Sequence, residues 1–272
     1  MIALIPTFQN LIDAVMCGHL HFGIPLHASF PNPCSKFETM GFQRFYETWF
    51  DHLHLLVNEL SSAPKPPINT TQDHHQTLVQ KAMSHYAEYY RIKSLAAKHD
   101  VLSLFAAPWS TSLERSLHWI AGWRPTTAFH LIYTESSILF ESQVLDILRG
   151  LRSGDLGDLS PGQFRRVSEL QCDTVREENS ITDELSAWQD GASDILGVAC
   201  GNNTPNIDGK LEGLGRILEK ADDLRLRTVQ NVVELLTPQQ AVQFLIAAAE
   251  LQFGVHSLGF NRDHALGRRS PN

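Results

Sequence analysis

The sequence predicts an all-α protein, and three observations support that prediction. Apolar residues recur at three- and four-residue steps through residues 42–60 and 78–107, which is the spacing of one helix face. Three segments carry helix-start signals, in which a hydroxyl residue is followed three positions later by Glu or Gln. The central stretch, 78–125, shows no strand-like alternation. We therefore expect seven to nine helices, packed as antiparallel neighbours in one bundle-like domain without a sheet.

The first helix is predicted over residues 42 to 61. Its apolar face continues for five turns and contains the aromatic residues Tyr46 and Trp49. A proline-rich stretch, which runs to about residue 71, ends this helix because proline lacks the amide donor and blocks further helical turns.

The centre of the chain predicts two more helical segments and a short third. A helical pattern over 76–98 breaks at Lys98-His99-Asp100 and resumes from Val101 to Ala107. After Pro108, Thr111 and Glu114 have the spacing of a capping box, in which side chain and backbone bond reciprocally at a helix start.

Two later helix starts repeat one device. Ser160-Pro161-Gly162-Gln163 and Thr237-Pro238-Gln239-Gln240 each place a hydroxyl at the N-cap, proline at the first helical position and Gln at the third. The helices predicted in this half of the chain are 125–148, 161–190, 210–236 and 238–256.

The overall charge argues against direct nucleic-acid binding. The chain has 22 Lys and Arg against 30 Asp and Glu, and its net charge of −8 repels phosphate backbones. Basic pairs such as Arg165-Arg166, and Arg225 with Arg227, are short and separated, so we interpret each as a solvated helix face.

Signatures of catalysis and of metal binding are missing from the sequence. It has no nucleophile elbow, no paired-histidine zinc pattern and no dinucleotide-binding glycine motif. The nearest phosphate-loop candidate, residues 201–210, has seven residues between its glycines where four are needed. His52 and His54 are two apart on a helix, so they point in different directions, and we interpret them as surface histidines. We expect neither enzyme activity nor a metal site.

Two blocks of sequence resemble a known family. The first is MSHYAEYYRIKSLAAKHDV followed by PWSTSLERSLHWIAGWRP, and the second is GKLEGLGRILEKADDLRLRTVQNVVELLTPQQAVQFLIAAAELQ. They resemble, in this order, the plant Delay of Germination (DOG) domain, which is also the C-terminal half of TGA-type bZIP transcription factors. The resemblance covers residues 40–260. We therefore expect a DOG domain there, a poorly matched extension over 1–39 and a disordered tail over 261–272. Since the resemblance begins near Met40, we interpret Met40 as the biological start and the upstream segment as a gene-model artefact.

The resemblance implies a plant regulatory protein of seed dormancy and germination. It implies action through protein–protein contacts with type-2C phosphatases of abscisic acid signalling, in the nucleus and cytoplasm. An alternative is a transcriptional co-regulator related to the TGA factors, which shares their role in the regulation of DNA-templated transcription without a DNA-binding region of its own. Residues 1–39 contain one basic residue, Lys36, and no heptads, so we expect no bZIP region there.

Candidate site residues follow from the same resemblance. In the related dormancy protein the equivalent of the first helix contacts the phosphatases, and Tyr46 and Trp49 match its aromatic pair; their periodicity equally favours burial in the core. That protein also binds haem through two histidines four residues apart near the end of the last helix. His256 matches the second, but Gln252 stands at the first, so a pair of histidine ligands is lost. We expect no cofactor, and a haem sensor with His256 as ligand is the second alternative.

Overall fold

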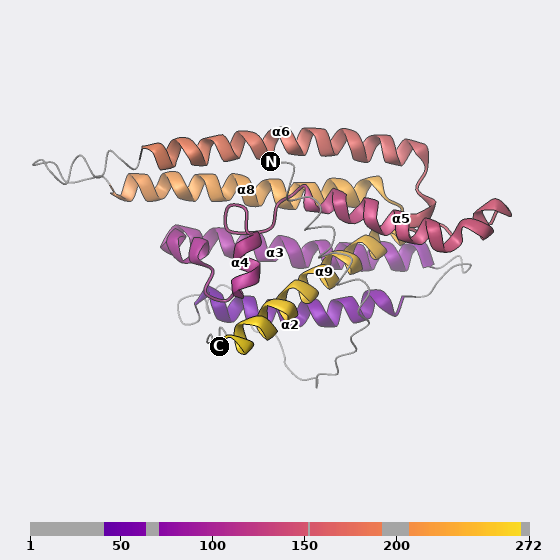
Figure 1. Ribbon diagram of the computed structural model, residues 1–272, viewed down its shortest axis with the longest axis horizontal. Coiled ribbons are helices and arrows are strands. Elements are labelled where there is room, and N and C mark those ends of the chain that lie inside the picture. The colour runs from indigo at the N-terminus through magenta and orange to yellow at the C-terminus, as the bar shows by residue number, and fades with distance from the viewer. Residues whose placement is uncertain (1–40, 64–70, 152, 192–206, 268–272) are drawn as a thin grey trace, which may run out of the picture.

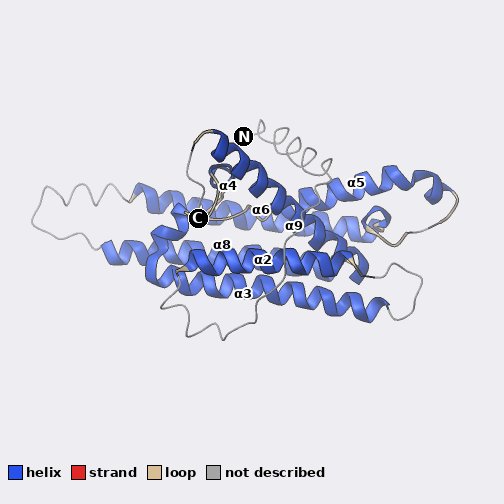
Figure 2. Ribbon diagram, turned by 90° about the horizontal axis from the view of Figure 1, so that it is seen from below, coloured by secondary structure: helices blue, strands red, loops and turns tan. Residues whose placement is uncertain are grey.

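A computed structural model describes residues 41–63, 71–151, 153–191 and 207–267, and within these ranges every regular element is a helix (Figures 1 and 2). The all-α prediction is confirmed. The proposed extension, 1–39, lies outside the described residues. The elements are α2 (Phe42–Ser61), α3 (Thr71–Ala106), α4 (Ser112–Leu117), α5 (Thr127–Leu148), the 3₁₀ helix η2 (Leu156–Asp158), α6 (Pro161–Asp190), α8 (Ile207–Leu235) and α9 (Pro238–Ala265).

Four long helices lie side by side in the order α6, α8, α3, α2, and α9 crosses α3 and α2 diagonally (Figure 1). The C-terminal half of α5 projects beyond the bundle in both views. Two apolar clusters fill the spaces between the helices. One gathers around Phe129, Ile132 and Phe244. The other gathers around Trp49 and Leu218.

The three predicted capping boxes are all present. The side-chain oxygens of Thr111, Ser160 and Thr237 each accept a hydrogen bond from the amide three residues later. Gln163 of one box also donates to the side chain of Gln240 in another, at 2.7 Å. The starts of α6 and α9 are therefore joined directly.

The predicted break near residue 100 is also confirmed, as a kink within α3. Asp100 has non-helical dihedrals, φ −152° and ψ 83°. Its carboxylate accepts from the amide of Ser103 at 3.0 Å. Asp100 thus caps the turn that follows the kink, as a helix-start residue does.

The last helix is longer than the sequence suggested. We predicted its end at 256 and a disordered tail over 261–272, but α9 continues to Ala265. Asp263 is buried and accepts a hydrogen bond from the amide of Ser112 at 2.8 Å, so the predicted end and the disorder of 261–265 are wrong. Residues 268–272 lie outside the described part.

Arg225 is not on a solvated helix face. Its side chain is fully buried and pairs with Asp222, which also binds Lys93 at 2.9 Å. The guanidinium donates to the backbone carbonyls of Trp119, Ile120 and Trp123 in the loop after α4. The interpretation failed because a buried arginine with partners for its donors has the same sequence spacing as an exposed one.

Helix α9 is also the one described helix that is long and apolar enough to span a membrane. Residues along it, including Phe244, Leu245 and Ala249, are buried against the rest of the bundle. A core helix of a folded domain passes the same test of length and composition.

Candidate functional site

Both candidate sites from the sequence lie in one corner of the molecule, where α2 and the last turns of α9 meet. A small cavity of about 150 Å³ opens there, and we call it the α2–α9 hollow. Its lining comes from α2, from α9 and from the segment before α4. The lining residues used below are Tyr46, Glu47, Phe50, Asp51, His256 and Phe260.

Tyr46 and Trp49 are core residues, with only 7% and 4% of their surface exposed. The Trp49 indole donates to the backbone carbonyl of His85 at 3.1 Å. Tyr46 forms a side-chain hydrogen bond with Gln252, and burial, followed by the charge of Glu114, raises the pKa of its hydroxyl. Their burial fits the alternative that we left open, and a direct part in partner binding stays a prediction.

His256 faces a carboxylate. Its Nδ1 lies 3.1 Å from both carboxylate oxygens of Glu114, and because a carboxylate only accepts, Nδ1 is the donor. Burial raises the pKa of Glu114, but the hydrogen bond and charge of His256 and the hydrogen bonds from Thr111 outweigh it and bring the pKa below its ordinary value. Glu114 also closes the α4 capping box, since it accepts from the amide of Thr111 at 2.7 Å. One carboxylate therefore links the start of α4 to α9.

The residues around His256 do not fit a haem. The position of the missing ligand, Gln252, is bonded to Tyr46. The hydrogen bond from Nδ1 of His256 to Glu114 does not itself exclude a ligand role, because metal-ligating histidines commonly donate their other ring nitrogen to a carboxylate. The hollow has about 150 Å³, whereas ligand pockets in proteins span roughly 300–1,000 Å³. Nor do three His, Cys, Asp or Glu side chains gather as a metal site anywhere in the described ranges.

Contacts between aromatic rings hold α2 and the end of α9 together in this corner. The ring of His54 stacks on Phe253, with centroids 3.6 Å apart and planes within 9°. Its Nδ1 contacts the carbonyl of Phe50 at 3.0 Å, so His54, which we interpreted as a surface histidine, is only partly exposed and packs into this corner. Phe50 in turn packs edge-on against Phe253. Such a preformed aromatic surface loses little conformational entropy when a partner binds.

The solvent-exposed part of the α2–α9 hollow consists of residues other than the buried pair Tyr46 and Trp49. Phe260 is 42% exposed, and Glu47 and Asp51 are exposed beside it. Sequence reasoning missed Phe260 because it ended the helix at 256. The available signal was spacing, since Phe253, His256 and Phe260 follow one another at three and four residues on one helix face. An aromatic hollow with an acidic rim can bind a protruding apolar or basic side chain of another protein.

Comparison with known proteins supports the resemblance seen in the sequence. A family profile for DOG1, described as "Seed dormancy control", matches residues 52–134. Protein DOG1-like 4 of Arabidopsis thaliana is 30% identical over 236 residues, which cover 82% of this chain and 93% of the relative. Protein DOG1-like 2 of the same plant is 27% identical over 236 residues, which cover 83% of this chain and 92% of the relative.

A second group of relatives carries a different name. Transcription factor TGA5 of Arabidopsis thaliana is 33% identical over 209 residues, which cover 76% of this chain and 60% of that protein. The relation to TGA factors is thus confirmed together with the relation to the DOG1-like proteins, which match over nearly their whole length. The chain belongs to the DOG1-like family of seed dormancy control proteins.

Proposed function

We propose that this protein is a non-enzymatic regulator of seed dormancy that acts by binding other proteins through the α2–α9 hollow. The partners are type-2C phosphatases of abscisic acid signalling. Membership of the DOG1-like family supports the regulatory role, since the family is described as seed dormancy control and one relative is named a transcription factor. The observation that carries the proposed surface is the exposed Phe260 beside the acidic rim of the hollow.

The arrangement suits a protein interface for two reasons. Exposed aromatic residues at the centre of a rigid patch supply much of the binding energy in interfaces. The buried pair Tyr46 and Trp49 supports that patch from below, so substituting either residue acts on the surface through the fold. Phe260 is the residue to change, since 42% of its surface is already exposed to solvent.

Affinity purification of the tagged protein from seed extract, with mass spectrometry of bound proteins, tests this proposal. A Phe260→Ser variant is compared with Phe164→Ser, because Phe164 at the start of α6 is 40% exposed and outside the hollow. We expect type-2C phosphatases with the wild type and with Phe164→Ser, and their loss with Phe260→Ser. Recovery of the phosphatases with both variants would overturn the proposed surface, and their absence from the wild type would overturn the proposed partner.

A second candidate function is transcriptional co-regulation in the nucleus. The match to TGA5, named a transcription factor, over 60% of its length favours it. The net charge of −8 argues that the protein joins DNA through bound partners and makes no phosphate contacts of its own. Recovery of bZIP factors without phosphatases in the same purification would favour this role. A tight, sequence-selective shift of DNA by the purified protein would contradict the indirect form of it.

A further inference from the structure

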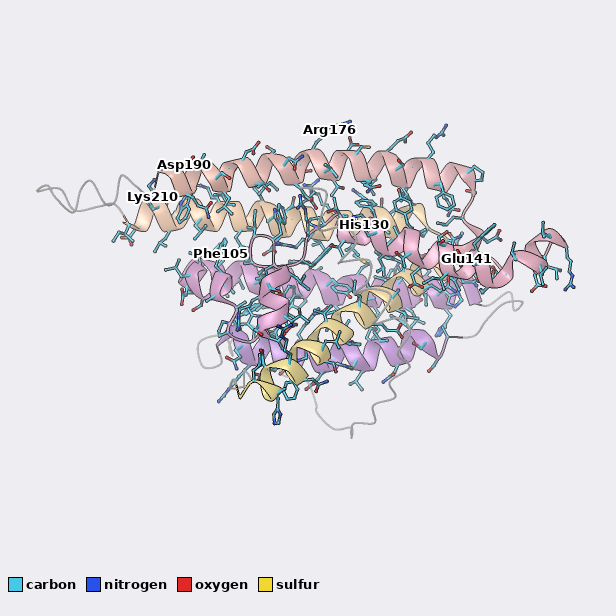
Figure 3. The ribbon with its side chains drawn as sticks, viewed as in Figure 1. Phe105, His130, Glu141, Arg176, Asp190 and Lys210 are labelled. Atoms are coloured by element: carbon cyan, nitrogen blue, oxygen red, sulfur yellow. The ribbon has the colours of Figure 1, made fainter. Side chains whose placement is uncertain are left out.

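A second surface lies between α3 and α8, away from the α2–α9 hollow. An open groove of about 760 Å³ runs between residues 90–102 of α3 and 208–226 of α8, and we call it the α3–α8 groove. Figure 3 marks the end of the bundle where it begins, with Phe105 on α3 and Lys210 on α8. The stretch of α8 along it has 19 residues and is therefore about 28 Å long, or roughly five helical turns.

Small side chains open the groove. Ser94 and Ala97 of α3 and Gly215 of α8 are among its lining residues, and we call them its floor; Leu211 and Leu218 flank that glycine in the sequence. A Cβ atom at Gly215 would have no neighbouring atom within 4 Å, so the backbone there borders open space. A groove between two neighbouring helices that is lined by small side chains lets a third helix pack closely against both of them.

The rim of the groove is acidic. Six carboxylates line it. Asp222 is paired with Lys93 and Arg225, and Asp223 is paired with Arg227, which leaves four against the cations Lys98 and Arg216. The four are Asp100 on α3, and Asp208, Glu212 and Glu219 on α8. Three of the four follow α8, so this side of the groove repels a phosphate backbone and attracts a basic surface.

We propose that the α3–α8 groove binds a basic amphipathic helix of a partner protein. The helix lays its small and apolar face on the Gly215 floor and directs Lys or Arg side chains to the carboxylates along α8. Apolar contact supplies the affinity, and the charges select the sign of the partner and speed its approach. A short segment would make too little apolar contact with the groove, and an acidic segment would be repelled by the carboxylates.

Fluorescence anisotropy with the full chain tests the proposal. The probe is a labelled helical peptide with Lys on one face and Ala and Leu on the other, and its counterpart carries Glu in place of Lys. We expect the Lys peptide alone to bind. Gly215→Leu fills the floor without changing charge, and a Glu212→Lys, Glu219→Lys variant reverses the rim. Each should weaken binding at least about tenfold.

The matched control is Glu169→Lys, Asp173→Lys, which makes the same charge change on exposed residues of α6. It should change affinity less than about twofold, since screening limits charges beyond about 10 Å. Equal weakening by both charge reversals, or an affinity unchanged by Gly215→Leu, would show attraction to net charge only and overturn the proposal. Failure of the Lys peptide to bind the wild type would overturn it too, and leaves Phe260 and the α2–α9 hollow unaffected.

Discussion

Trp49 and His85 bind each other through two reciprocal hydrogen bonds and a ring stack, and this pair joins α2 to α3. The indole nitrogen of Trp49 donates to the His85 carbonyl at 3.1 Å, and Nε2 of His85 donates to the Trp49 carbonyl at 3.2 Å. The two rings are parallel within 5°, with centroids 4.9 Å apart. The packing of α2 against α3 below the α2–α9 hollow is therefore fixed by hydrogen bonds to the backbone as well as by the contact between the two rings.

This pairing predicts that acid loosens the contact between α2 and α3. Burial lowers the pKa of His85 to about 4, despite the hydrogen bond to Trp49. The unfolded chain takes up the proton near pH 6.5 and the folded chain only near pH 4, so the stability is present above pH 6.5 and is lost as the pH falls between these values. Urea unfolding at pH 7 and pH 5 should show a smaller loss in His85→Gln than in the wild type, by up to about 1.4 kcal/mol per pH unit.

An exposed histidine provides the control for that measurement. His74→Gln changes a residue at the solvent side of α3, and it should show the pH dependence of the wild type. A His85→Gln variant with an unchanged pH dependence would contradict the role given to the buried ring.

Removing Arg225 should destabilise the fold strongly. The substitution Arg225→Ala leaves three carbonyls of the 119–123 loop without their donor and leaves Asp222 with Lys93 alone. Breaking a buried ion pair in this way costs about 3–5 kcal/mol. Arg227→Ala, which removes exposed pairs with Asp223 and Glu177, should cost at most about 1 kcal/mol. Similar unfolding midpoints for the two variants would contradict this account of the loop.

Neutralising Glu135 should stabilise the protein. One oxygen of its carboxylate is buried without a hydrogen-bond partner, and burial, followed by the charge of Glu250, raises its pKa. A raised carboxyl pKa means that the charged form costs stability at neutral pH, and that the cost disappears as the pH falls below the ordinary value of 4.5. Glu135→Gln should therefore melt at a higher temperature than the wild type at pH 7. The two should converge near pH 4, and a lower melting temperature at pH 7 would refute the assignment.

Two glycines should respond oppositely to alanine. A Cβ atom at Gly259 would lie 2.7 Å from the Cβ of Thr111, so Gly259→Ala pushes the end of α9 away from α4 and costs about 1–3 kcal/mol. Gly215 borders open space, so Gly215→Ala should stabilise α8 by up to about 1 kcal/mol. Trypsin cleavage after Arg262 should be faster in Gly259→Ala only. Equal cleavage rates would mean that α9 does not need this close approach.

The predictable part of the fold rested on contacts within a few residues. The capping boxes at Thr111, Ser160 and Thr237 each close over three residues, and the break at Asp100 is a local cap of the same kind. Such bonds form between near neighbours in the chain, so residue type and spacing suffice to predict them.

The missed features depend on distant partners. Asp263 extends α9 through Ser112, 151 residues away, and Arg225 binds a loop more than 100 residues before it. Tyr46 and His256 were each proposed separately, but the hollow they share comes from the crossing of α2 and α9, which no local pattern records. Phe260 was missed because we predicted that α9 ends at residue 256, whereas it continues to Ala265.

The central claim is that the exposed aromatic residue of the α2–α9 hollow binds a type-2C phosphatase. Its most direct test is the affinity of the purified protein for a purified phosphatase of that class, measured by biolayer interferometry for wild type, Phe260→Ser and Phe164→Ser. We predict that Phe260→Ser weakens binding about tenfold or more, as loss of an interface anchor does, while Phe164→Ser changes it less than about twofold. Equal affinities for all three proteins, or no binding by the wild type, would contradict the claim.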